Sequence, residues 1–199
     1  SASDSGHLFP VGDMTCNEQA IAATFYLSNM SPQVPTFNRG IWKSLESNVR
    51  KWAVEKDSIF VVTGGILSNP KGSIGANRVT IPTRYYKVIY DLTGEKKMIA
   101  FILTNEKGTK QISEYVVTVD DVESLTGIDF FPCLQDSLEN RLERTSDISK
   151  WSFNLISISS SGKSVQCKGI AKTAGLRCKN RTIIYEMYEL NNDNEKNIN

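Results

Sequence analysis

Asp4-Ser5-Gly6-His7-Leu8-Phe9-Pro10 opens the stretch of sequence that decides the fold, and its His7 is the only histidine among 199 residues. The next polar segment is Ser28-Asn29-Met30-Ser31-Pro32-Gln33. It is followed by Phe37-Asn38-Arg39-Gly40-Ile41-Trp42-Lys43-Ser44-Leu45-Glu46, which runs on to Arg50. An imidazole, amides, a carboxylate and guanidinium groups therefore gather near the start of the chain, and we expect the functional site there.

A helix is the clearest element of this stretch. Asn38 is expected to cap it, and residues 42–53 contain no helix breaker. One face should be buried because it carries apolar residues at helical spacing: Ile41, Leu45, Val49 and Trp52. A neighbouring stripe of the same helix carries polar groups at steps of four or eight residues: Asn38, Glu46 and Arg50.

The rest of the chain predicts mainly antiparallel strands with a few short helices, which is an α+β fold. A strand at 24–27 and a proline-containing loop at 31–35 are expected before the helix. The other expected strands are 58–63, 78–81, 85–91, 98–103 and 115–119. Short helices are expected at 19–23, 120–125 and 138–143. We predict one domain over residues 1–155, followed by a linker, a basic cysteine-containing segment and a tail over 156–199.

Composition and charge are those of a globular protein and argue against a membrane-spanning one. The chain is 40% hydrophobic and 23% charged with a net charge of +1, which is ordinary for a globular protein. No apolar run approaches the roughly 18 residues of a membrane span, so we expect no membrane segment. Residues 1–4 have neither the basic nor the apolar region of a signal peptide, so a signal is either unused or lies before residue 1.

The cysteines do not form a recognisable metal motif. Cys16, Cys133, Cys167 and Cys178 contain no CxxC pair, and a zinc site would need them at odd spacing. Buried free thiols, or a Cys167–Cys178 disulfide in an exported chain, are the other interpretations, and the count does not decide the compartment.

The polar residues of the first segments are sufficient for phosphodiester hydrolysis. A histidine can deprotonate water at neutral pH, and a hard divalent cation can neutralise the developing negative charge. Asn38 can offer such a cation a neutral oxygen, Glu46 can hold its waters, and Arg50 can contact a phosphate. Each residue alone has a plainer interpretation: a loop histidine, a helix cap, or a surface pair between Glu46 and Arg50.

Taken together, these segments resemble the DNA/RNA non-specific endonuclease family. The Asp-x-Gly-His, Ser-Asn-Met-Ser-Pro-Gln and Phe-Asn-Arg-Gly-x-Trp-x-x-Leu-Glu patterns carry the resemblance. It continues through Val62–Gly65, Ile81–Lys87 and Glu123–Phe131. The resemblance implies a ββα-metal (His-Me finger) nuclease core with a mainly antiparallel central sheet and flanking helices.

The resemblance also implies roles for individual residues. His7 corresponds to the general base, and Asn38 to the direct protein ligand of a hydrated Mg²⁺, for which Mn²⁺ or another divalent cation can substitute. Glu46 corresponds to the acid that anchors the metal's waters, Arg50 to a phosphate contact, and Asn29 to a support of the active-site loop. The implied activity is hydrolysis of DNA and RNA to 5′-phosphate products, with little regard for sequence or sugar.

Two departures from the family pattern affect this interpretation. Ser5 stands where the family usually has arginine, and one lost electrostatic donor lowers a rate by about 10²–10³. Family members also usually have several dozen residues before the histidine motif, including strands of the central sheet. Another chain completing that sheet, a homodimer and an inhibitor protein are therefore partners that we consider.

Further nucleic-acid contacts are expected both near the site and in the C-terminal basic segment. Near the site they are Asp4 and Arg39. In the basic segment they are Lys168, Lys172, Arg177 and Lys179, which should grip the backbone without reading sequence. A secreted or periplasmic bacterial protein is the expected location. The competing hypotheses are a weakened or inactive nucleic-acid-binding protein on the same fold, and a histidine-dependent hydrolase of small phosphate esters.

Overall fold

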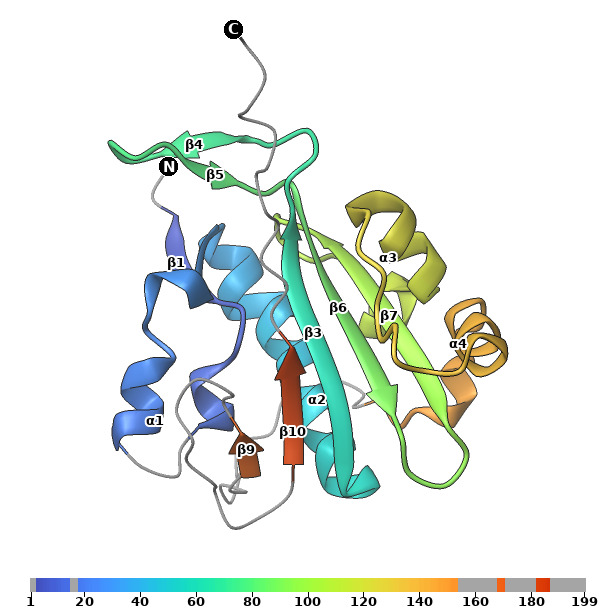
Figure 1. Cartoon of the computed structure of the whole chain (residues 1–199). Helices are drawn as coiled ribbons and strands as arrows, with labels where there is room; N and C mark the ends of the chain where they lie inside the picture. The colour runs from blue at the N-terminus through green and yellow to red at the C-terminus, as the bar shows by residue number, and fades with distance from the viewer. Residues whose placement is uncertain (1–2, 15–17, 154–167, 171–181, 187–199) are drawn as a thin grey trace, which may run out of the picture.

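The computed structural model describes residues 3–14, 18–153, 168–170 and 182–186, and in the last two ranges only the backbone. A six-stranded sheet forms its centre, in the order β8-β7-β6-β3-β10-β9 (Figure 1). The strands are β3 (Ser58–Ile66), β6 (Arg84–Asp91), β7 (Lys97–Thr104), β8 (Val116–Val117), β9 (Lys168–Ile170) and β10 (Thr182–Glu186). Strands β3, β6, β7 and β8 are antiparallel to their neighbours in that series, whereas β10 is parallel to both β3 and β9.

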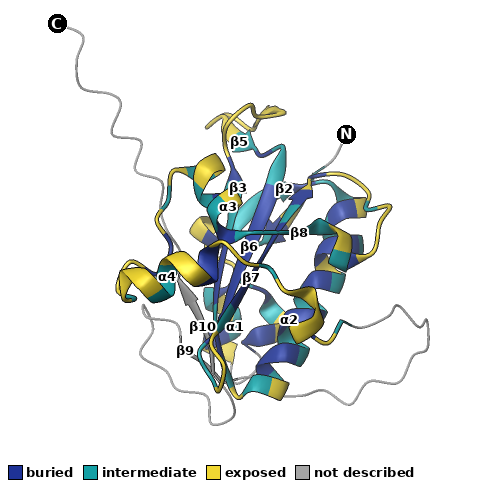
Figure 2. Ribbon diagram, turned by 90° about the vertical axis from the view of Figure 1, so that its right-hand side faces the viewer, coloured by how far each residue is buried: buried dark blue, intermediate teal, exposed yellow. Residues whose placement is uncertain are grey.

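Two apolar layers cover the two faces of this sheet. Successive side chains of a strand point to opposite faces, so Tyr85 and Ile89 pack toward one layer while Tyr86 and Val88 pack toward the other. The first layer contains α2 (Lys43–Lys56), and the second contains α3 (Val119–Thr126) and α4 (Asp136–Glu143) (Figure 1). Figure 2 shows β6 and β7 buried between these layers, while much of α4 is exposed. The predicted α+β class is confirmed.

Helix α2 buries the face that its apolar spacing predicts. Ile41, Leu45, Val49 and Trp52 are all at most 8% exposed. A π-helical segment, Phe37–Trp42, precedes α2, and its Gly40 has non-helical dihedral angles. The prediction that Asn38 caps the helix is wrong, because the N-cap is Thr36 for the π-helical segment and Trp42 for α2, and the Asn38 amide donates to Asp4 instead.

Strand β1 (Asp4–His7) pairs with β2 (Met30–Gln33) in an antiparallel ribbon beside α2. The predicted loop at 31–35 is therefore wrong for residues 31–33. Pro32 is tolerated because the ribbon has only two strands, so its missing N–H interrupts no central ladder. The Pro32 carbonyl accepts hydrogen bonds from Tyr85 Oη at 2.9 Å and Asn105 Nδ2 at 3.1 Å, which attaches the ribbon to the sheet.

Short helical turns connect the two ribbon strands. They are the 3₁₀ turn Val11–Asp13, helix α1 (Glu18–Ala23) and the 3₁₀ turn Leu27–Asn29. The short helix is confirmed, but the predicted strand at 24–27 is wrong. Thr24 instead continues the turn after α1, where its hydroxyl donates to the Ile21 carbonyl at 2.7 Å.

The layer on the opposite face begins after β7. A 3₁₀ turn, Ile112–Tyr115, leads into β8, so only part of the strand predicted at 115–119 forms. Thr118 caps α3 by accepting from the Asp121 N–H, and Gly127 ends it with a φ of 71°. The other elements are the hairpin of β4 (Gly72–Ile74) and β5 (Val79–Ile81) and the 3₁₀ turn Ile148–Lys150.

The central sheet includes strands from both sides of the predicted boundary at residue 155. Strand β10 pairs with β3 over Thr182–Glu186, so this part of the expected accessory segment belongs to the sheet. It covers the β3 edge, whose backbone groups would otherwise be open to other strands. No helix in the described ranges is both long and apolar enough to cross a bilayer.

Strand β3 extends beyond its predicted end at residue 63, because Gly64 and Gly65 pair with Tyr86 and Tyr85 of β6. Both glycines also face close neighbours. A Cβ at position 64 would lie 2.5 Å from Tyr86 Oη. We expect Gly64→Ala to lower the free energy of unfolding by about 1–3 kcal/mol through overpacking. Urea unfolding of Gly64→Ala, Tyr86→Leu and the double variant measures the coupling free energy between the two positions. An equal cost of Gly64→Ala in both backgrounds would contradict this steric explanation.

Candidate active site

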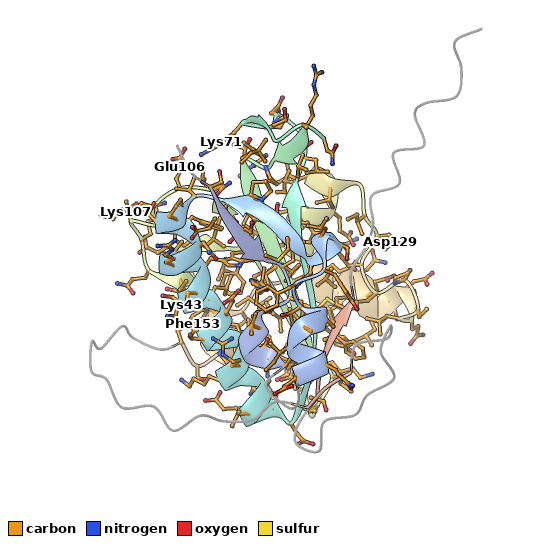
Figure 3. All side chains as sticks on the ribbon, turned by 90° about the vertical axis from the view of Figure 1, so that its left-hand side faces the viewer. Lys43, Lys71, Glu106, Lys107, Asp129 and Phe153 are labelled. Atoms are coloured by element: carbon orange, nitrogen blue, oxygen red, sulfur yellow. The ribbon has the colours of Figure 1, made fainter. Side chains whose placement is uncertain are left out.

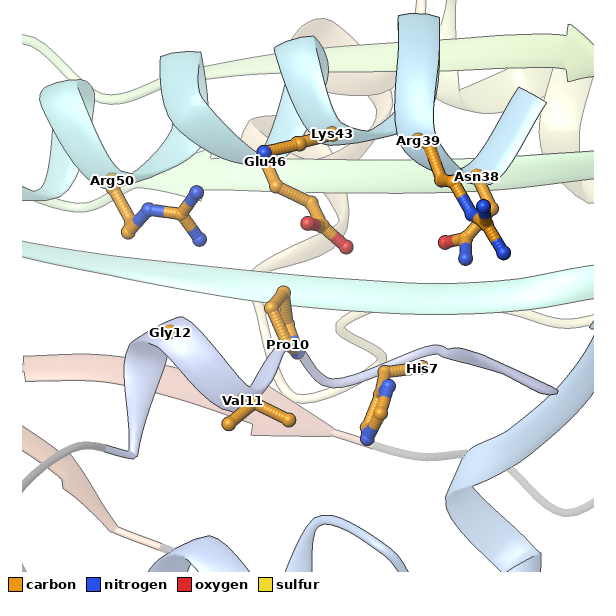
Figure 4. Close-up of a pocket in the computed structure, with 9 residues that line it drawn as sticks. All are labelled: His7, Pro10, Val11, Gly12, Asn38, Arg39, Lys43, Glu46 and Arg50. Atoms are coloured by element: carbon orange, nitrogen blue, oxygen red, sulfur yellow. The ribbon is translucent and has the colours of Figure 1, made fainter. Parts of the chain in front are cut away.

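An open cavity with a volume of about 470 Å³ lies between α2 and the segment that follows β1 (Figure 4). The predicted site residues His7, Asn38, Glu46 and Arg50 all line it. The remaining lining residues are Pro10, Val11, Gly12, Arg39 and Lys43. Segments far apart in the sequence therefore meet at this cavity, as the ββα arrangement requires.

Asn38 is oriented by Asp4. Its Nδ2 donates to Asp4 Oδ2 at 3.0 Å, which fixes which end of the amide is the oxygen. In Figure 4 that oxygen points toward the carboxylate of Glu46, which is about two turns further along the helix. The cavity therefore presents a neutral oxygen and a carboxylate to the same space, a donor set that suits a hard cation such as Mg²⁺.

Arg39 and Asp4 form an ion pair at the rim of the cavity. Arg39 Nε and Nη2 donate to the two Asp4 oxygens at 2.8 and 2.7 Å. These hydrogen bonds, with that from Asn38, hold the pKa of Asp4 below its usual value. Asp4 thus acts on Asn38 and Arg39, and its carboxylate would repel a phosphate. The expected nucleic-acid contact of Arg39, whose side chain is 74% exposed, stays a prediction.

Glu46 shares a poorly solvated region with a buried lysine that sequence reasoning did not single out. Burial raises the pKa of Glu46 to about 7, although the nearby Lys87 and Arg50 favour its charged form. Lys87 is 0% exposed, and burial lowers its pKa. Its Nζ donates to Thr63 Oγ1 at 2.5 Å and lies 4.8 Å from the Trp42 ring centroid.

Arg50 is held in place by an ion pair with the buried Asp13. Its Nη1 lies 3.0 Å from Asp13 Oδ1, and its Nη2 donates to Ser47 Oγ at 3.3 Å. The absence of a side chain at Gly12 permits this approach, because a Cβ there would lie 3.2 Å from Arg50 Nη1. The guanidinium is still partly exposed, at 27% of the side chain, and can meet an anion in the cavity.

His7 lies at the cavity, but its ring does not face Asn38. In Figure 4 the imidazole extends away from α2, and it contacts the edge of Phe25 with ring centroids 4.8 Å apart. Burial lowers its pKa, so the ring is neutral at neutral pH. Its buried Nε2 has no hydrogen-bond partner among the described residues.

Asn29 fixes the segment that follows His7. Its Oδ1 accepts from the Phe9 N–H at 2.7 Å, while its Nδ2 donates to the carbonyls of Phe9 at 2.9 Å and Thr24 at 2.7 Å. The side chain is 4% exposed, so it reaches no substrate. The geometry suits a support of the loop, as the resemblance implies.

Sequence reasoning missed three charged residues of this region: Asp13, Lys43 and Lys87. Lys43 lines the cavity directly. Lys87 could have been found from the sequence, because it occupies a core-facing position of an alternating strand. A lysine there is costly to bury unless it has a partner, which indicates a charged site nearby. Lys168 begins β9, and its side chain is not described. Lys172, Arg177 and Lys179 lie outside the described residues.

The chain also matches a family of known proteins. Residues 2–137 match the family model described as DNA/RNA non-specific endonuclease. The chain belongs to the DNA/RNA non-specific endonuclease family. The family resemblance carried by the histidine, asparagine and helix motifs is thereby confirmed.

Named relatives and a solved structure agree with this assignment. Nuclease C1 of Cunninghamella echinulata var. echinulata is 39% identical over 151 residues, which are 69% of this chain and 60% of that protein. The mitochondrial endonuclease G of Caenorhabditis elegans is 36% identical over 146 residues, 66% of this chain and 47% of that protein. This chain therefore spans only about half to three fifths of the length of these two members of the endonuclease family.

The fold resembles that of an endonuclease G. A chain from the crystal structure titled as the EndoG/EndoGI complex and the mechanism of EndoG inhibition has a TM-score of 0.62 and 31% identity to this chain. The match covers 73% of this chain and 64% of that one. The predicted ββα-metal nuclease core is confirmed by this likeness.

Lys87 should control how tightly this endonuclease-family site holds a divalent cation. A protonated Glu46 cannot accept from metal-bound water, so affinity should rise with pH until the pH passes the Glu46 pKa. Lys87→Met removes the charge that favours the carboxylate and should raise that pKa. A rise of about one unit from about 7 would lower the ionised fraction of Glu46 at pH 7 from about one half to about one tenth and weaken Mg²⁺ binding about fivefold, measured by calorimetric titration.

The same titration at pH 8.5 should show a smaller difference, because Glu46 is then ionised in both proteins. Thr63→Val is the matched control, since it removes one hydrogen bond of Lys87 and keeps the charge. Equal Mg²⁺ affinity of wild type and Lys87→Met at pH 7 would show that Lys87 does not act on Glu46.

Proposed function

We propose that this chain is a metal-dependent endonuclease that hydrolyses the phosphodiester bonds of DNA and RNA to 5′-phosphate products. The observation that carries the proposal is the convergence of the Asn38 amide oxygen and the Glu46 carboxylate in one cavity with a basic rim. Membership of the DNA/RNA non-specific endonuclease family supports the same activity.

Asn38 would hold Mg²⁺ directly, and Glu46 would accept hydrogen bonds from the ion's waters. The bound ion supplies positive charge to the phosphorane and to the departing 3′-oxygen, and Mn²⁺ or another divalent cation can substitute. The donor chemistry supports this ion, because both side chains offer oxygen and the direct ligand is neutral. Asp4 is the positioning residue, since its hydrogen bond keeps the Asn38 oxygen directed into the cavity.

His7 is the proposed general base. Its ring must turn toward the cavity, which is a change between staggered rotamers about χ1. Because Nε2 has no hydrogen-bond partner in the described part of the chain, the turn breaks no hydrogen bond at this atom. The lowered pKa of His7 supports the role, since a neutral imidazole can accept a proton from the attacking water.

The basic residues at the cavity would bind the substrate's phosphates. Arg50, fixed by Asp13, can form a charge-assisted hydrogen bond to the scissile or a neighbouring phosphate. Lys43 and Arg39 add positive charge at the rim. Such contacts address the backbone and ignore the bases, which fits cleavage without sequence preference.

The proposal also covers a partner protein, the domain organisation and the location of the protein. An inhibitor protein is one candidate partner, because the similar crystal structure is titled as the EndoG/EndoGI complex and the mechanism of EndoG inhibition. We further propose that the catalytic residues all lie in a domain formed mainly by residues 1–155, to which β9 and β10 add two strands of the sheet, with the basic segment gripping nucleic acid. Export from the cytoplasm fits, because an unspecific nuclease would otherwise degrade the cell's own nucleic acid.

Nicking of supercoiled plasmid in millimolar Mg²⁺ tests the proposed activity. We expect EDTA to abolish cleavage, and we expect cleavage to decline below about pH 6 as His7 becomes protonated. His7→Ala should lower the rate by about 10²–10⁴ while Mg²⁺ binding persists. Asn38→Ala should lose both binding and cleavage.

Asn140→Ala is the matched control for Asn38→Ala, because Asn140 is an exposed amide on α4, away from the cavity. Cleavage that survives His7→Ala would rule out the general base. A wild-type chain that binds DNA without nicking it would favour the alternative, a weakened nucleic-acid-binding protein. The orientation of His7 and the serine at position 5 are the observations that favour this alternative.

Restoring the family's arginine should strengthen the site. Ser5 and His7 are two residues apart on β1, so their side chains share one face of the ribbon. We expect Ser5→Arg to raise the nicking rate by up to about 10²–10³ through a new electrostatic donor beside the phosphate. Ser5→Gln has a neutral side chain of intermediate length and should leave the rate nearly unchanged. An equal gain from both variants would show that charge is not the cause.

A further inference from the structure

A second cluster of charged side chains lies between α3 and α4, on the sheet face opposite the cavity. It consists of Asp120, Glu123, Asp129, Glu139 and Glu143. Their ligand oxygens form two groups that share Glu143, and within each group these atoms lie within 4.8 Å of one another. In Figure 3, Asp129 and the cavity residue Lys43 lie on different sides of the molecule.

The two helices direct these carboxylates toward each other. Asp120 and Glu123 are three residues apart on α3, and Glu139 and Glu143 are four apart on α4, so each pair shares one helix face. Like charges at these spacings destabilise a helix by a few tenths of a kcal/mol. The arrangement therefore works against both helices unless positive charge lies between them.

Glu143 shows that this is more than an acidic surface. It is 6% exposed, and its Oε1 is buried without a hydrogen-bond partner among the described residues. The same holds for Oε1 of Glu139. A buried, unpaired carboxylate is strongly unfavourable, and proteins pair such groups with cations or metal ions.

No described positive side chain compensates for this charge. Burial raises the pKa of Glu143 to about 7, and the other groups that raise it are all carboxylates: Glu123, Glu139, Asp120 and Asp129. Glu123 Oε1 accepts a hydrogen bond from the Phe130 N–H at 2.8 Å, and this bond leaves its second oxygen to other partners. At pH 8 the cluster is thus a concentrated negative charge with free oxygens.

We propose that the carboxylate cluster between α3 and α4 is a calcium site, in which Glu143 holds the ion together with carboxylates of α3. An ion there would bridge the two helices and stabilise their packing against β7. It would take no part in cleavage, because it lies across the sheet from Asn38 and Glu46.

The number of carboxylates in the cluster favours Ca²⁺ over Mg²⁺. Calcium accepts six to eight oxygens at about 2.3–2.6 Å, so opposite ligands lie about 5 Å apart. The ligand oxygens of each group lie within 4.8 Å of one another, which a calcium coordination sphere accommodates. Magnesium requires near-ideal octahedral geometry with ligands at about 2.0–2.1 Å and usually keeps several waters, which suits a site with fewer carboxylates.

Thermal unfolding of the whole chain at pH 8 tests the site. The Asn38→Ala background removes the proposed nuclease metal, and EDTA treatment followed by dialysis removes bound ions. We expect CaCl₂ at a hundredfold excess over its Kd to raise Tm by about 5–10 °C. Calorimetric titration should give one ion per chain, and MgCl₂ at the same concentration should raise Tm less.

Adding Glu143→Gln should abolish the calcium response, and its Tm without calcium should match or exceed that of the Asn38→Ala parent, because a buried charge is removed. Glu106→Gln, at an exposed carboxylate paired with Lys71, is the control that should keep the response. A Tm indifferent to calcium, or a full response in Glu143→Gln, would overturn the site. An equal response to magnesium would overturn the assignment of the ion.

Discussion

The carbonyl of Pro32 is the point on which the arrangement of the cavity depends. A two-stranded ribbon is at best marginally stable alone, and β1–β2 is attached to the sheet where Tyr85 and Asn105 donate to this one oxygen. Asn105 also accepts from the Val34 N–H at 2.8 Å, so the chain leaving the ribbon toward α2 is fixed at the same place. The strand that carries His7 and the helix that carries Asn38 thereby share one support.

Within that frame, one hydrogen bond decides what the cavity can bind. An asparagine amide can present either its oxygen or its NH₂ group, and only the oxygen can hold a cation. The bond from Asn38 Nδ2 to Asp4 makes that choice, and Arg39 in turn keeps Asp4 ionised and in place. A contact between β1 and the start of the helix therefore converts a flexible polar side chain into an oriented ligand.

Periodicity and motif spacing predicted the parts of the fold in which local sequence and tertiary packing agree. Leu45 and Trp52 lie on one helix face because 3.6-residue spacing leaves no other way to bury both. Pro32 in a strand and Phe25 in a turn could not be predicted, since partners distant in sequence override local propensity there: Ser5 pairs with Pro32, and the His7 ring packs on Phe25. The motifs located His7 and Asn38 at one cavity, but a side-chain rotamer such as that of His7 depends on packing that no motif records.

The net charge of +1 conceals two regions of opposite sign on opposite faces of the sheet. Around the cavity, Arg39, Lys43, Arg50 and the buried Lys87 outnumber the carboxylates, so a cation held by a neutral amide gains from the arrival of phosphate oxygens. Between α3 and α4 no positive side chain of the described ranges offsets the carboxylates, so a cation there would be held by the protein itself. The substrate's phosphates would balance the charge of the ion proposed at the cavity, whereas the protein's own carboxylates would balance that of the ion proposed between α3 and α4. The first arrangement suits a catalytic ion and the second a structural one.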